Sequence, residues 1–280
     1  MNINQMNNIV AGFDIPAPES LNCIKDMVSD VEWELRCQLA ATYRLCAKYG
    51  WTDLVFTHIS VRLPDEENDK GEMEERFLIN PYGLLFHEIT ASSLIKIDLQ
   101  GNICQETPYF INPAGFTIHS AVHMARHDAA CVIHVHTPYG IAVSVQNNGL
   151  RRYTQFAMQI IDDLAYHDYE GIALNLDERE QIIADLGDKN LLMLRNHGTL
   201  TIGQNCAIAF LRMYFLENAC KTQILAQNGA NDGGLCEHPP EMAATVSAQG
   251  AAAFHPGMGD NLIWPALIRD LRRTHAGFDQ

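Results

Sequence analysis

The 280-residue chain is poor in basic residues and contains no long apolar run. Its 19 Lys and Arg residues stand against 34 Asp and Glu residues, and the net charge of −15 opposes nonspecific binding to nucleic acids and anionic lipids. No stretch approaches the roughly 20 apolar residues that a membrane-spanning helix needs. The N-terminus also lacks the basic start and apolar core of a secretory signal. We therefore expect a cytoplasmic protein without nucleic-acid or membrane partners.

The eight cysteines include no C-x-x-C pair, and several lie in apolar helix or strand patterns. Reduced cysteine behaves as a small hydrophobic residue in such places, so the spacing favours a reducing compartment. The Gly-rich stretch 229–234 lacks the strand-then-helix setting of a nucleotide-binding loop. Neither feature predicts a cofactor site.

Hydrophobic residues make up 47% of the chain, which is enough for a large core. Residues 1–27 carry scattered Asn, Pro and Gly and are predicted to form an N-terminal arm. Residues 28–227 contain no repeat and no linker, and are predicted to form one domain. Residues 228–280 are rich in Gly, Ala and Pro, which predicts a loosely attached extension that ends in a helix.

Helical and strand-like patterns alternate along the body, which predicts an α/β fold. The predicted helices are 30–50, with Asp30 as the N-cap, 116–127, 138–145, 178–186, 205–227 and the terminal helix 264–273. The predicted strands are 54–63, 76–80, 94–98, 131–138, 158–164 and 191–203. We expect antiparallel pairing among the first three strands, and a polar surface loop over residues 64–75.

Three histidines carry the most specific chemical signal. His134 and His136 flank Val135 in a β-branched segment, and side chains two apart on a strand share a face. His197 follows the apolar run 191–194 at a turn marked by Gly198. Three neutral imidazoles suit zinc, iron(II), manganese or cobalt and leave coordination positions open. The alternative interpretation is that each histidine only forms hydrogen bonds with neighbouring groups. We predict a metal site.

Several segments that contain these histidines resemble the class II aldolase/adducin family across about residues 30–230. The matching segments are 79–83, 97–101, His119 with 125–128, 134–138 and 194–198. Residues 79–85, 90–94 and 116–123 are more similar to the adducin head and its bacterial relatives than to sugar-phosphate aldolases. The resemblance implies a three-layer α/β fold with a mixed central sheet flanked by helices. It also implies a homotetramer with a metal site in a cleft near a subunit boundary.

The resemblance assigns His134, His136 and His197 as zinc ligands. It places His58 in a turn that cradles the anionic group of the substrate, and Asn80 and Gly83 in a substrate-binding segment.

At one position the chain departs from the family pattern. Gly115 stands where the family aldolases carry a catalytic glutamate, and Pro113 and Ala114 replace hydroxyls that would bind a substrate phosphate. His119 and Tyr139 are our candidates for the missing proton transfer.

Three functions agree with these residues. The favoured one is a divalent-metal-dependent carbon–carbon lyase, of aldolase or decarboxylase type, acting on a small hydroxy or keto carboxylate or carbonyl compound. Zinc is the expected ion, with manganese or iron(II) as alternatives. A non-haem Fe(II) oxygenase of the same fold is the second possibility. A nonenzymatic adducin-like binding protein is the third, because glycine cannot transfer a proton.

Overall fold

The computed structural model describes residues 14–67, 71–171, 178–230 and 234–280. Its centre is a seven-stranded sheet with the order β5-β4-β1-β6-β9-β8-β7. The strands are β1 His58–Arg62, β4 Arg76–Ile79, β5 Ile95–Asp98, β6 Cys131–Val135, β7 Leu164–His167, β8 Leu191–Leu194 and β9 Gly198–Gly203. Only the β7–β8 pair is parallel within this sheet, so the predicted mixed sheet is confirmed.

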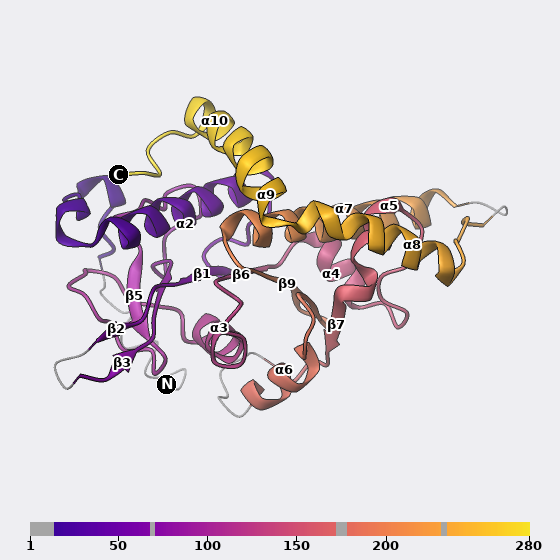
Figure 1. Cartoon of the computed structure of the whole chain (residues 1–280), viewed down its shortest axis with the longest axis horizontal. Coiled ribbons are helices and arrows are strands. Elements are labelled where there is room, and N and C mark those ends of the chain that lie inside the picture. The colour runs from indigo at the N-terminus through magenta and orange to yellow at the C-terminus, as the bar shows by residue number, and fades with distance from the viewer. Residues whose placement is uncertain (1–13, 68–70, 172–177, 231–233) are drawn as a thin grey trace.

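Helices cover both faces of the sheet (Figure 1). The helices α2 Asp30–Lys48 and α7 Cys206–Gly229 lie on one side, and α3 Pro113–Ala125 and α6 Glu178–Leu186 lie on the other. The other α-helices are α4 Pro138–Ser144, α5 Gln155–Ile160, α8 Pro240–Gly250, α9 Pro256–Met258 and α10 Trp264–Thr274. The three layers agree with the predicted fold. Among the described residues, no helix is both long and apolar enough to span a membrane.

Strand alternation decides which layer each side chain enters. Ile59 of β1 and Ile133 and Val135 of β6 are fully buried and pack with residues of α2 and α7. The residues of β6 that alternate with them, Val132 and His134, point to the opposite face, where Val132 packs with apolar residues of α3 and α6. His134 therefore lies on the α3 side of the sheet, and Val135 points into the core as predicted.

The sequence patterns misplaced several local boundaries. Ser29, not Asp30, is the N-cap of α2, because the Ser29 hydroxyl accepts a hydrogen bond from the Glu32 backbone N–H at 3.1 Å. The predicted strand 54–63 begins only at His58, since Leu54 adopts a left-handed turn with φ 47°.

Two further segments also differ from the prediction. The segment 158–164, predicted as a strand, is the end of α5 and the 3₁₀ turn Ile161–Asp163. Thr154 caps that helix by accepting from the Ala157 N–H at 3.2 Å. The predicted surface loop 64–75 contains the short antiparallel strands β2 Glu66–Glu67 and β3 Met73–Glu74.

The C-terminal extension packs onto the body. Helix α8 contacts α5, and α10 contacts α2, above which it is drawn in Figure 1. The last residues add backbone hydrogen bonds, since the Ala91 and Ser92 N–H groups donate to the carbonyls of Phe278 and Gln280 at 2.8 and 2.9 Å. Phe278 is buried in the main core. The predicted terminal helix is present as α10, but the extension is better attached than its composition suggests.

Candidate metal centre

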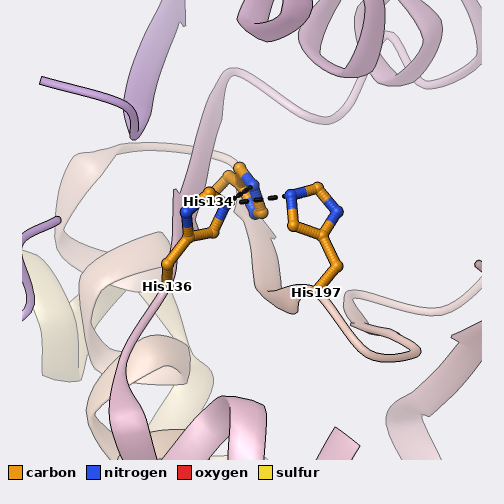
Figure 2. Close-up of side chains that lie close together, drawn as sticks. All are labelled: His134, His136 and His197. Carbon is orange, nitrogen blue, oxygen red and sulfur yellow. Dashed lines mark hydrogen bonds between the residues drawn. The ribbon is translucent and has the colours of Figure 1, made fainter. Parts of the chain in front are cut away.

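Three histidine side chains converge at one end of the central strands (Figure 2). The Nε2 atom of His136 lies 2.9 Å from Nε2 of His134 and 2.9 Å from Nε2 of His197. His134 belongs to β6 and His136 follows the strand, while His197 occupies the tight turn between β8 and β9. In that turn Asn196 takes a left-handed conformation with φ 58°, a conformation that Asn tolerates better than most residues. The structure therefore brings together the three predicted ligands.

Hydrogen bonds to the other ring nitrogens fix the orientation of two rings. His134 Nδ1 lies 3.0 Å from the Thr199 carbonyl oxygen, and His136 Nδ1 lies 2.9 Å from Asp53 Oδ2. Carbonyl and carboxylate oxygens only accept, so both Nδ1 atoms carry the proton. In the neutral rings, the Nε2 atoms of His134 and His136 then present lone pairs to each other.

Such an arrangement is repulsive unless a cation lies between the nitrogens. A proton could satisfy one of the two short contacts, but the His136 Nε2 atom faces both other rings at 2.9 Å. A divalent ion satisfies all three nitrogens at once, and a ligand histidine whose Nδ1–H donates to an oxygen is the common arrangement at metal sites. The residues present therefore fit a metal ion.

Burial keeps two of the predicted ligand rings, those of His134 and His197, neutral. Loss of solvent, followed by the effect of the neighbouring imidazoles, lowers the pKa of His134 well below its usual 6.5. The same causes, burial first, lower the pKa of His197 to about 4. A neutral imidazole has the lone pair that a metal requires, so these two ligands are available at neutral pH.

The profile of the family described as "Class II Aldolase and Adducin N-terminal domain" matches residues 37–224. The chain belongs to this family. It is 52% identical over 255 residues to a Caulobacter vibrioides protein provisionally named as an aldolase class 2 protein, and the match covers 91% of this chain and 95% of that one. Mouse alpha-adducin is 42% identical over 235 residues, which are 82% of this chain and 31% of that protein.

A solved structure gives the same result for the fold. The L-fuculose 1-phosphate aldolase from Glaciozyma antarctica superposes with a TM-score of 0.75 and 25% identity, covering 97% of this chain and 99% of that one. The predicted family and its fold are thus confirmed. Class II aldolases use a divalent metal ion, and the histidine cluster of this chain fits such an ion.

The structure places His58 and His119 next to the metal centre on the α3 side of the sheet. His58 is the register partner of His134 across β1 and β6, and their rings are nearly parallel with centroids 6.5 Å apart. His119 meets His58 edge-on at 5.9 Å. The His119 Nδ1 atom shares a hydrogen bond with the Ser60 hydroxyl at 2.6 Å. His58 therefore lies between His119 and the ligand His134.

The other predicted site residues have different surroundings. Asn80 is buried, and its Oδ1 accepts from the Tyr43 hydroxyl at 2.8 Å. Gly83 adopts φ 105° and packs so closely against Ile15 that a Cβ would overlap it. Tyr139 lines a cavity of about 360 Å³. None of the three ligand histidines lines this cavity in the described part of the chain. Substrate binding by Asn80 and Gly83 and catalysis by Tyr139 remain predictions.

Two carboxylates that sequence analysis missed support the ligands. Asp53 orients His136, and Glu217 of α7 accepts hydrogen bonds from the hydroxyls of Thr137 and Thr199. Thr137 follows the ligand His136, and the Thr199 carbonyl accepts from the ligand His134. No motif marks either acid, since Asp53 lies 83 residues from His136, and Glu217 lies 80 residues from Thr137 and 18 residues from Thr199.

Replacing Asp53 with alanine is expected to weaken binding of a divalent metal ion by roughly 10- to 100-fold, the usual loss when a hydrogen-bond partner of a ligand is removed. The His136 ring would lose the acceptor that fixes its tautomer and orientation. Titration against a chelator of known affinity measures the effect. Asp188→Ala removes a carboxylate that is 89% exposed and serves as the matched control. An unchanged affinity in Asp53→Ala would show that the carboxylate does not orient the ligand.

Proposed function

We propose that the protein is a divalent-metal-dependent carbon–carbon lyase, of aldolase or decarboxylase type, acting on a small hydroxy or keto carboxylate or carbonyl compound. The observation that carries this proposal is the convergence of ring nitrogens from His134, His136 and His197. Zinc is the ion we propose, because three imidazoles suit it and leave a position open for substrate. The similarity to a solved L-fuculose 1-phosphate aldolase supports the same class of reaction.

When bound, the ion would supply Lewis-acid polarisation of a substrate oxygen. The protein's own residues must hold the substrate and move protons. We assign His58, Asn80 and Gly83 to the substrate side of the site, and His119 and Tyr139 remain candidates for proton transfer. A homotetramer, as the family resemblance implies, would complete the cleft around the metal centre.

One observation favours a nonenzymatic, adducin-like binding protein instead. Gly115 provides no carboxylate at the position where the family resemblance places the acid–base group, and proton transfer by a positioned side chain typically contributes about 10²- to 10⁴-fold to a rate. The metal centre argues against that alternative. The carboxylates Asp53 and Glu217 support the segments that carry its histidines, and such an arrangement has no evident use in a scaffold.

The experiment begins with elemental analysis of protein purified without added metal. The lyase proposal predicts one zinc per chain, and zinc-dependent turnover or α-proton exchange with at least one of hydroxypyruvate, oxaloacetate and dihydroxyacetone. NMR in D₂O and coupled assays for released CO₂ detect these reactions. Stoichiometric iron with consumption of O₂ would indicate the oxygenase. Protein that contains no metal, or that binds zinc and leaves all three probes unchanged, would contradict the lyase proposal and favour the binding protein.

A further inference from the structure

The space beside Gly115 is filled by the His58 ring. A Cβ atom added to Gly115, in the first turn of α3, would lie within 2.6 Å of three carbon atoms of that imidazole. Real Cβ atoms do not approach other heavy atoms so closely. No side chain larger than hydrogen therefore fits at position 115 while His58 keeps this conformation. The glycine and the histidine are sterically matched, and an imidazole stands where a carboxylate side chain would otherwise begin.

The position of His58 on the sheet directs it to the metal centre. Its Cα pairs with that of His134 across antiparallel strands, and directly opposed residues project from the same face. The Ser60 hydroxyl, two residues further along β1, lies 2.6 Å from His119 and 2.7 Å from His123. These contacts hold the α3 histidines behind His58. The ring is thus supported on one side and adjoins the ligand His134 on the other.

Both nitrogens of the His58 ring lack a hydrogen-bond partner among the residues that the structure describes, although the residue is only 3% exposed. An unpaired buried polar atom destabilises the folded state, and such groups in native proteins call for an explanation. A substrate oxygen or a transferring proton at the metal centre would provide the missing partner. This pattern distinguishes His58 from His119 and His123, each of which has one nitrogen engaged by Ser60.

We propose that the His58 imidazole performs the proton transfer for which Gly115 provides no group. This inference rests on the proposed lyase function and names the catalytic residue of that site. In α-proton exchange, one ring nitrogen of His58 takes the proton from the carbon beside the substrate carbonyl. The C–H electron pair becomes the C=C bond of the enolate, and the carbonyl π pair moves to oxygen. The reverse transfer, after the nitrogen exchanges its proton with D₂O, delivers a deuteron to the carbon.

The test exchanges the two side chains. His58→Ala should retain one zinc per chain and lower zinc-dependent exchange of the hydroxypyruvate CH₂ protons by about 10²- to 10⁴-fold. The double variant His58→Ala/Gly115→Glu places a carboxylate in the vacated space. It should recover at least roughly a tenth of wild-type exchange. A histidine with only a packing role predicts no such rescue.

Stability provides a readout that does not depend on activity. Gly115→Glu alone should lower the urea midpoint, because its side chain overlaps the His58 ring, and adding His58→Ala should restore the midpoint. Gly229→Glu is the matched control, since a Cβ at Gly229 would meet no atom within 4 Å. Absence of coupling between the two positions would contradict the steric premise and overturn the proposal.

The remaining outcomes separate this inference from the proposed function. Full exchange activity in His58→Ala would overturn the role of His58 and leave the lyase intact. A folded, zinc-loaded double variant that is no more active than His58→Ala would also overturn it. Wild-type protein that binds zinc and catalyses no exchange, cleavage or decarboxylation of the three probes would instead refute the lyase function, and with it the proton transfer.

Discussion

Replacing His136 with alanine is expected to eliminate stoichiometric zinc binding. The His136 Nε2 atom is the one that lies 2.9 Å from both other ligand nitrogens, so its loss leaves two imidazoles and an opened site. The expected loss of affinity exceeds the roughly 10- to 100-fold reduction that follows when only a ligand's hydrogen-bond partner is removed. Elemental analysis and chelator competition on the purified variant measure it.

The same substitution should also remove the effect of added zinc on the free energy of unfolding. A ligand that binds only the folded state at 1,000 times its dissociation constant adds about 4 kcal/mol to the free energy of unfolding. Wild-type protein should gain this increment when zinc is added, and His136→Ala should gain almost none. His238→Ala, at an exposed histidine outside the cluster, should behave as wild type. An equal zinc-dependent gain in His136→Ala would show that the ion binds elsewhere.

The His134 and His136 pair could be predicted because its geometry is local: alternation along one strand places both side chains on one face. His197 joins them through the pairing of β6 with β9, and the family resemblance implied that contact. The helices α2, α3, α4, α6, α7 and α10 were likewise predictable from their apolar periodicity. Such patterns depend on residues a few positions apart, so a single sequence contains them.

The rest of the site depends on contacts between distant segments. Asp53 reaches His136 from a turn before β1, and no local pattern indicates that contact. The fit between Gly115 and His58 is invisible for the same reason, since it joins α3 to β1. Sequence analysis identified the absent glutamate but could not show which side chain occupies its space. The wrong strand prediction for 158–164 also reflects contacts between distant segments, because helix α5 contacts both α7 and α8.

Glu217 leads to the second large prediction, which concerns the dependence of stability on pH. Its side chain is almost fully buried in α7, and burial raises the pKa of Glu217 from 4.5 to about 7 despite the hydrogen bonds from Thr137 and Thr199. The folded state therefore holds this proton more tightly than the unfolded state. A shift of this size corresponds to about 3 kcal/mol.

The direction of the pH effect follows from the ionisation of Glu217 in the folded and in the unfolded chain. Below pH 4.5 the carboxyl is protonated in both the folded and the unfolded chain, so the folded state carries no penalty. As pH rises from 4.5 through about 7, the unfolded chain ionises first, and the folded state loses about 3 kcal/mol relative to it. Glu217→Gln keeps the shape of the side chain and removes the ionisation. The variant should therefore become more stable relative to wild type by about 3 kcal/mol between pH 4.5 and pH 8.

Urea unfolding of wild type and Glu217→Gln across this pH range measures the difference. Other groups that titrate, including the buried histidines, contribute equally to both proteins and cancel when the two curves are subtracted. Glu241→Gln, at an exposed position of α8, should give a curve parallel to wild type. If the free energy of unfolding of Glu217→Gln runs parallel to that of wild type across this pH range, the carboxylate ionises in the folded chain as easily as in water. The hydroxyls of Thr137 and Thr199 would then offset its burial, and the segments that carry His134 and His136 would be held by a charged acceptor.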